Sequence, residues 1–206
     1  LINAVEAEEC RVAIVKKNRL EEFYIESAAR EITQGNIYKA TIARIEPSLQ
    51  AVFVDYGAER NGFLQKYEIH SDYFQDLESG DHDIRNLVKR GQELLVQVTK
   101  EPLMKKGAML TTYISLAGRY LVLMPGSDKK GISRKIADEE ERVRLKGLVD
   151  KLKLPDDFGV IVRTAGDHCT KTLLVRDLRY LMRLWKTIKG SVMKEKAPAL
   201  LYKERH

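Results

Sequence analysis

The chain has 206 residues and a formal net charge of +6, from 36 Lys and Arg against 30 Asp and Glu. Hydrophobic residues make up 44% and charged residues 32%, a balance typical of folded globular proteins rather than of disordered chains. No apolar run approaches the roughly 18–20 residues of a membrane helix, and no signal-peptide core stands at the N-terminus, so we expect a cytoplasmic protein. Cys10 and Cys169 lie far apart, which excludes a disulfide scaffold and a zinc ribbon.

The first residues predict a β-hairpin. Residues 11–15 and 20–25 are short apolar or alternating runs joined by a polar turn. A lone hairpin is marginally stable in water, so it needs a further packing partner. The chain also opens on Leu1 in the middle of an apolar segment, and we therefore expect a piece of a longer protein.

The central part predicts a small closed barrel, because short strands with turn signals dominate it and helical spacing is rare. The predicted strands are residues 37–45, 49–56, 62–64, 94–98 and 111–114. The polar stretch 71–86 shows no hydrophobic period, and we expect a long exposed loop there.

The last part mixes strands and helices, so the overall fold class is α+β. Buried strands are predicted at residues 120–124 and 158–162. Apolar spacing predicts helices at residues 138–152 and 173–188. In the first, Val143 is expected on the apolar face with Leu145, Leu148, Val149 and Leu152, and Gly190 is expected to end the second.

The barrel carries the first chemical signal. Alternation along residues 51–56 puts Phe53 on the face opposite Val52 and Val54, and Phe63 follows Gly62 one strand later. Exposed aromatic residues interleaved with cations form a stacking platform for single-stranded nucleic acid. The neighbouring cations are Lys39, Arg44, Lys100, Lys105 and Lys106. The alternative is that both phenylalanines belong to the core and the cations to an ordinary solvated surface.

The second signal follows the predicted strand 158–162. Arg163 and Thr164 end that strand and are followed by small residues, Ala165 and Gly166. A guanidinium binds phosphate bidentately, a hydroxyl adds a directional donor, and glycine lets backbone N–H groups approach an anion. The basic stretch 129–135 could form a second wall. The alternative is a strand end with ordinary polar residues.

Other candidates for chemistry are weaker. The adjacent residues 81–83 (Asp-His-Asp) fit a solvated loop better than a metal site, and residues 168–169 (His-Cys) lack partners at ligand spacing. Asp55 and Glu59 are the only carboxylates near the expected binding face, which gives thin support to metal-dependent catalysis. No phosphate loop, nucleophile elbow or zinc signature is present, so the residues assemble no catalytic centre.

Several strings resemble the N-terminal half of the ribonuclease E/G family of endoribonucleases. The strings lie at residues 1–4, 36–39, 45–64, 113–125, 131–134 and 161–166. The resemblance extends in order over essentially all 206 residues, and the string at 45–64 looks more like the ribonuclease E branch than the ribonuclease G branch.

The resemblance implies three parts. Residues 1–34 would be the first half of a ribonuclease-H-like subdomain, into which an OB-type RNA-binding barrel of the ribosomal-protein type, residues 35–112, is inserted. Residues 113–206 would be the 5′ sensor, a pocket for the monophosphorylated 5′ end of RNA. The family's catalytic domain, with its magnesium-binding aspartates, would follow residue 206, so we expect this chain not to cut RNA by itself.

The resemblance also implies site residues. Those of the barrel that match RNA-contacting positions are Lys39, Phe53, Phe63 and Lys106. Those that match the sensor pocket are Gly118, Val122, Arg134, Arg163 and Thr164, in which Arg163 and Thr164 would hold the phosphate. Thr33 and Gln34 stand where relatives often carry lysines, so that flank should contribute less to binding.

The function implied is binding of single-stranded RNA with recognition of 5′-monophosphate ends, as part of a bacterial endoribonuclease (a hydrolase) of RNA processing and mRNA decay. No cofactor is expected in this chain, while the full-length enzyme would need Mg²⁺, form a homotetramer and have partners in an RNA-decay complex. Much of the +6 charge should lie on the barrel lysines and Arg163. Two alternatives stay open: that the chain is itself a metal-dependent ribonuclease, or that it is a scaffold with a vestigial RNA surface.

Overall fold

The computed structural model describes residues 2–6, 9–16, 19–27, 32–75, 83–102 and 106–204. It divides into two compact units, Leu1–Thr33 and Gln34–His206, which are described separately.

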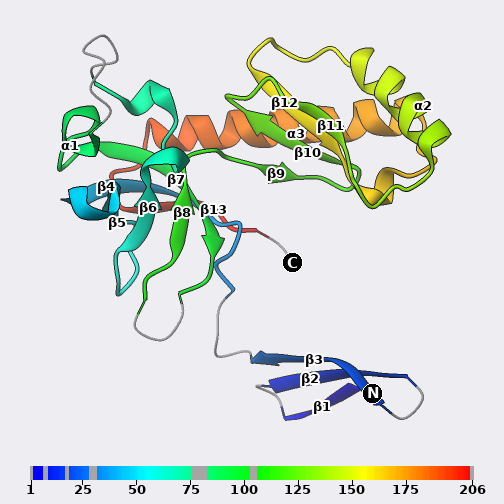
Figure 1. Cartoon of the computed structure of the whole chain (residues 1–206), viewed down its shortest axis with the longest axis horizontal. Coiled ribbons are helices and arrows are strands. Elements are labelled where there is room, and N and C mark those ends of the chain that lie inside the picture. The colour runs from blue at the N-terminus through cyan, green and yellow to red at the C-terminus, as the bar shows by residue number, and fades with distance from the viewer. Residues whose placement is uncertain are drawn as a thin grey trace. The chain divides into compact units, whose positions relative to one another are not determined.

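The first unit is a three-stranded antiparallel sheet (Figure 1). Its strands, in the spatial order β1-β2-β3, are β1 (Ile2–Glu6), β2 (Glu9–Lys16) and β3 (Arg19–Ser27). The predicted hairpin is confirmed as β2 and β3. The packing partner that a hairpin needs includes β1, which pairs with the free edge of β2.

The second unit begins with a five-stranded barrel, as predicted, although its fifth strand ends at Thr111, where the predicted strand 111–114 begins. Its strands are β4 (Ile37–Glu46), β5 (Ala51–Asp55), β6 (Gly62–Gln65), β7 (Glu93–Lys100) and β8 (Met109–Thr111). The spatial order β4-β5-β6-β8-β7 closes because β7 also pairs with β4. Beyond the end of β5, the strand β13 (Ala199–Tyr202) pairs with the first residues of β4. The C-terminal part of the described chain thus returns to the barrel.

The interpretation of residues 71–86 as one exposed loop is wrong at both ends. Ser71–Tyr73 is a 3₁₀ helix, and Ile84–Leu87 is the short helix α1. Ile84 is fully buried in the barrel core, and Leu87 is 2% exposed. Residues 76–82, which include two of the three metal-like residues at 81–83, lie outside the described ranges. The third, Asp83, caps α1 by accepting a hydrogen bond from the Arg85 N–H.

The remaining elements form an α+β layer. Its sheet, in the order β11-β12-β10-β9, consists of β9 (Leu116–Ala117), β10 (Leu121–Pro125), β11 (Lys130–Ile132) and β12 (Phe158–Val162). Helix α3 (Lys171–Val192) packs against one face of this sheet, and α2 (Glu139–Asp150) contacts β11 (Figure 1). Three further 3₁₀ turns are Pro47–Leu49, Lys66–Glu68 and Thr164–Gly166.

Two details of the helices differ from the prediction. Gly190 lies inside α3, which continues to Val192, and a Cβ at Gly190 would meet only open space. Val143 is 65% exposed, because a residue two positions before the buried Leu145 lies on the opposite side of a helix. Among the described residues, no helix is long and apolar enough to cross a membrane.

Candidate nucleic-acid interface

Phe53 and Phe63 form a cross-strand aromatic pair on the outside of the barrel. They are direct partners in the register of β5 and β6, and their ring centroids are 5.6 Å apart. Both side chains are half-buried, whereas their neighbours Val52 and Val54 are fully buried in the core. The alternation along β5 therefore leaves an aromatic surface on the solvent side, and the core alternative does not hold for these two residues.

Arg44 adds a cation to this aromatic pair. It faces Phe53 in the register of β4 and β5, and its guanidinium carbon lies 4.5 Å from the Phe53 ring centroid. A guanidinium over an aromatic ring covers that ring face and itself presents a planar cation on which a base can stack. Gly62, beside Phe63, makes room for the barrel core, because a Cβ there would collide with Leu110 Cδ1.

The two barrel lysines lie apart from each other. Lys39 is largely buried, and its ammonium pairs with Glu93 at 2.9 Å and donates to the Glu195 carbonyl at 3.1 Å. Lys106 is exposed beside β6, two residues before Ala108, whose carbonyl accepts from the Phe63 N–H. The structure thus brings Lys106 to the segment flanking the aromatic pair, whereas the charge of Lys39 is already neutralised by Glu93.

The second cluster lies where β12 ends, at the turn between β9 and β10. Arg163 is exposed, and its Nη1 donates to the carbonyl oxygen of Gly118. Its backbone N–H donates to the Tyr120 carbonyl at 2.7 Å, so main chain and side chain both hold this turn. A guanidinium has five N–H donors, and the side chain makes no other hydrogen bond among the described residues. Its remaining donors are available to an anion.

The other sensor candidates surround Arg163. Thr164 is exposed, with its hydroxyl 3.1 Å from the hydroxyl of Ser133, and Arg134 follows in the same exposed turn. Val122 lies half-buried on β10 as the partner of Ile161. The structure therefore gathers these residues around one end of the sheet. Ser133 was not singled out individually from the sequence, because only the tertiary fold brings its hydroxyl to Thr164.

Asp177 positions the turn between β9 and β10, and no pattern in the sequence singled it out. It lies in α3 and is 9% exposed. Its carboxylate accepts the N–H groups of Arg119, Tyr120 and Leu121 at 3.2, 2.8 and 2.9 Å. A Cβ at Gly118 would lie 2.6 Å from Asp177 Oδ2, so glycine is the only residue that lets the turn approach this carboxylate without displacement.

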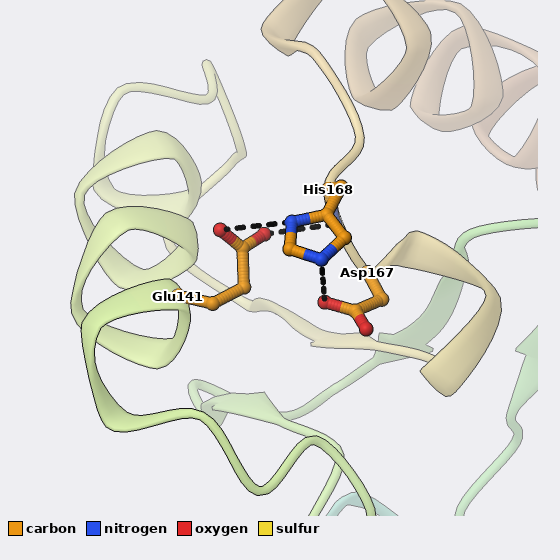
Figure 2. A group of neighbouring side chains, drawn as sticks. All are labelled: Glu141, Asp167 and His168. Carbon is orange, nitrogen blue, oxygen red and sulfur yellow. Dashed lines mark hydrogen bonds and ion pairs between the residues drawn. The ribbon is translucent and has the colours of Figure 1, made fainter.

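A second network anchors the loop after Thr164. Figure 2 shows the His168 ring between the carboxylates of Glu141, which lies on α2, and Asp167. Glu141 Oε2 is 3.7 Å from Nδ1 of the ring, and Asp167 Oδ1 is 3.8 Å from Nε2. Glu141 also accepts the His168 N–H at 2.9 Å and two hydrogen bonds of 2.6 Å from Arg144. The expectation that His168 lacks partners is thus wrong, because Glu141 is distant in sequence and near in space.

This network fits a structural role better than a metal site. The Arg144 guanidinium lowers the pKa of Glu141 to about 2, mainly through its hydrogen bonds to the carboxylate. A cation would have to displace that guanidinium, which also donates to the Cys169 carbonyl at 3.0 Å. Glu141 and Arg144 therefore tie the loop that follows Arg163 and Thr164 to α2.

Asp55 and Glu59 belong to no converging group of three possible metal ligands among the described residues. Asp55 accepts the Gly57 N–H at 3.0 Å and stabilises the turn after β5, and Glu59 is exposed in the same turn. Within the described ranges, the one group of three possible metal ligands that converges is that of Glu141, Asp167 and His168. We assign no step of RNA cleavage to these residues.

Comparison with known proteins agrees with this arrangement. Residues 31–112 match the S1 RNA binding domain, and residues 115–206 match the ribonuclease E/G family. The chain is 48% identical to ribonuclease E of Haemophilus influenzae over 207 residues, which cover 99% of this chain and 22% of the relative. It is 47% identical to ribonuclease E of Escherichia coli K12 over 207 residues, covering 99% of this chain and 19% of the relative.

Ribonuclease G of Escherichia coli K12 is 42% identical over 190 residues, covering 90% of this chain and 38% of the relative. The identities to ribonuclease E are thus higher, as the string at residues 45–64 predicted. The chain spans about a fifth of the length of the ribonuclease E relatives, 22% and 19% in the two cases above. With an S1 RNA binding domain followed by a ribonuclease E/G segment, this chain belongs to the ribonuclease E/G family.

Proposed function

We propose that this chain binds single-stranded RNA on the barrel and recognises a 5′-monophosphate at the end of β12. The observation that carries the proposal is the state of Arg163. Its side chain is held in place by the Gly118 carbonyl, yet it is exposed and retains free donors, and the next residue, Thr164, carries an exposed hydroxyl. A positioned guanidinium with a neighbouring hydroxyl suits a terminal phosphate, which offers several acceptor oxygens.

The barrel supplies binding that does not depend on the RNA end. Phe53 and Phe63 offer ring faces to bases, and Arg44 and Lys106 offer positive charge near them. Stacking tolerates any base, so this surface gives affinity with little sequence preference. The 5′ end would then be selected at Arg163 and Thr164, with Gly118 and Val122 beside the terminal nucleotide and Arg134 as a supporting cation.

The test compares two RNAs that differ only at the 5′ end. Arg163→Ala should lower the affinity for a 5′-monophosphorylated oligonucleotide by roughly 10- to 100-fold, since hydrogen bonds to charged groups contribute about 1.5–3 kcal/mol. It should change the affinity for the 5′-hydroxyl form less than twofold. Fluorescence anisotropy titration measures both. Lys146→Ala, which removes an exposed cation from α2, is the control of equal charge.

An equal loss on both RNAs would remove the sensor assignment and leave Arg163 as a general backbone contact. Thr164→Val offers a second measurement, because it deletes only the hydroxyl and should lower the 5′-monophosphate preference without changing charge.

The roles of the whole protein rest on the family. We propose that, together with the part of the family that this chain does not span, it acts as a magnesium-dependent endoribonuclease in cytoplasmic RNA processing and decay. Four expectations stay predictions. They are the ribonuclease-H-like character of residues 1–34, the domain boundaries at 34/35 and 112/113, the homotetramer, and the partners in a decay complex. The alternative that the chain alone is a ribonuclease gains no support from Asp55 and Glu59, because they join no group of three possible metal ligands among the described residues.

A further inference from the structure

The positive charge of this protein is concentrated outside the barrel. Residues 113–206 contain 21 Lys and Arg against 12 Asp and Glu, whereas residues 35–112 contain 10 against 11. The net charge is thus +9 in the last part and −1 in the barrel part. Because the S1 domain of this chain has no net positive charge, the long-range attraction of an RNA polyanion comes largely from the last part.

Helix α3 holds much of this charge. Its cations are Lys171, Arg176, Arg179, Arg183, Lys186 and Lys189. Asp177 is the one acidic residue of the helix, and it is buried and bonded to the turn before β10. The solvent-facing side of α3 therefore carries positive charge with no acidic residue of its own helix beside it.

Part of this helix lines a cavity of about 530 Å³, together with the segment that follows α2. Five exposed cations surround it: Lys151, Lys153, Lys171, Arg179 and Arg183. Three apolar side chains complete the lining: Val175, Leu178 and Met182. We call this cavity the α3 groove. Among the described residues, none of its five cations forms an ion pair.

The lack of ion pairs distinguishes this groove from several basic positions elsewhere in the described chain. Lys39, Arg85, Arg142 and Arg144 are each paired with a carboxylate. Five unpaired cations around one concave surface repel one another, and an anion in the groove relieves that repulsion.

We propose that the α3 groove binds the sugar–phosphate backbone of single-stranded RNA, at a site separate from the aromatic pair and from Arg163. This inference rests on the proposed RNA-binding function. Lys171, Arg179 and Arg183 follow one stripe of α3 that extends about 18 Å at 1.5 Å per residue, which suits an extended strand better than a single phosphate. The arginine forks match phosphate oxygens, and the apolar lining suits ribose and base faces.

The groove and the barrel belong to one compact unit, so a strand held at the barrel reaches the groove at a high effective concentration. Each contact can then be weak while the combined affinity is high. This arrangement favours RNA as the occupant over an acidic polypeptide, since the S1 domain of the same unit already selects RNA.

The test uses the 206-residue chain and a 5′-hydroxyl oligonucleotide of about 20 nucleotides, so that no terminal phosphate contributes. Arg179→Ala/Arg183→Ala should weaken binding about tenfold at low salt. It should also lower the slope of log affinity against log salt by about 1.4, which is 0.7 for each lost contact to a single strand. The matched control is Lys89→Ala/Arg90→Ala, two exposed cations after α1 that do not line the groove.

The proposal is overturned if both double variants lose affinity equally, because the effect would then be a change in total charge. It is also overturned if polyglutamate of equal length competes as well as RNA, which would assign the groove to an acidic polypeptide. Failure of the 5′-sensor proposal would give a different result in these binding measurements. The wild-type chain would then not distinguish 5′-monophosphate from 5′-hydroxyl RNA, while the groove variant would still differ from its control. Circular dichroism checks that the variants fold.

Discussion

One carboxylate determines the geometry of the turn that the proposed phosphate site uses. Asp177 accepts three consecutive N–H groups, and the carbonyl of Gly118 on the same turn accepts from Arg163. Asp177 is only 9% exposed, so it acts by positioning Gly118 and, through it, the guanidinium.

Asp177→Ala should lower the free energy of unfolding by more than about 3 kcal/mol, because each of three N–H groups left without a partner costs about 1–3 kcal/mol. Urea denaturation measures this change. Asp177→Asn keeps the volume and should mainly lower the preference for 5′-monophosphate RNA. Asp150→Ala, at an exposed position on α2, is the control for losing a carboxylate. If Asp177→Asn folds with an unchanged preference, Asp177 has no positioning role.

Phe53→Ala should weaken RNA binding across sequences by about 1–3 kcal/mol, since one stacked base is lost. Anisotropy titration with oligonucleotides of different composition measures it. Tyr67→Ala removes an aromatic residue that is 68% exposed on the same barrel, and it should change affinity less than twofold. An unchanged affinity for Phe53→Ala would exclude the aromatic pair from the RNA surface.

At the scale of elements, the loop between β12 and α3 carries Arg163 and Thr164, and residues of α2 hold it in place. Glu141 and Arg144 of α2 bind its backbone at His168 and Cys169. Burial raises the pKa of the Cys169 thiol, so this cysteine is a packing residue rather than a nucleophile. The Glu141 network stabilises the loop in a pH-dependent way.

The folded pKa of Glu141, about 2, lies below its ordinary value of 4.5. Its contribution to stability is therefore present above pH 4.5 and is lost as the pH falls towards 2. Glu141→Gln should melt at a lower temperature than wild type at pH 7, and the difference should shrink between pH 4.5 and 2. Glu139→Gln removes an exposed carboxylate from the first turn of the same helix and should show almost no difference at any pH. A pH-independent difference for Glu141→Gln would contradict this cause.

The sequence predicted most elements because their local patterns were consistent. Residues 158–162 became β12 without any shift of boundary, and alternation placed Phe53 on the outer face of β5. The errors fall where short segments depend on tertiary contacts. Ile84 and Leu87 form a single apolar pair, too short for a hydrophobic period, yet the barrel buries both. Gly190 did not end α3, because an exposed glycine costs only about 1 kcal/mol within a helix.

At the scale of the whole molecule, the described chain consists of two units that divide after Thr33. The family matches cover residues 31–112 and 115–206, both almost entirely within the second unit. The expected concentration of charge on the barrel lysines is wrong, because the barrel part carries no net positive charge.

A chain of residues 34–206 should therefore fold and melt within about 3 °C of the full chain, since its barrel and its α+β layer each have a buried core. Its affinity for RNA should change less than twofold. Differential scanning calorimetry and anisotropy titration measure both quantities. Loss of the cooperative transition on removing residues 1–33 would show that the second unit depends on the first.

The sequence by itself determined the family, the α+β class, the barrel and the two residues, Arg163 and Thr164, on which the phosphate proposal rests. These depend on local patterns: alternation, helical spacing and contiguous strings. Only the tertiary structure decided that Asp177 holds the Gly118 turn, that Glu141 anchors the loop at His168, and that five cations meet in the α3 groove. Each of these joins residues far apart in the chain, and such contacts are set by how the layers pack.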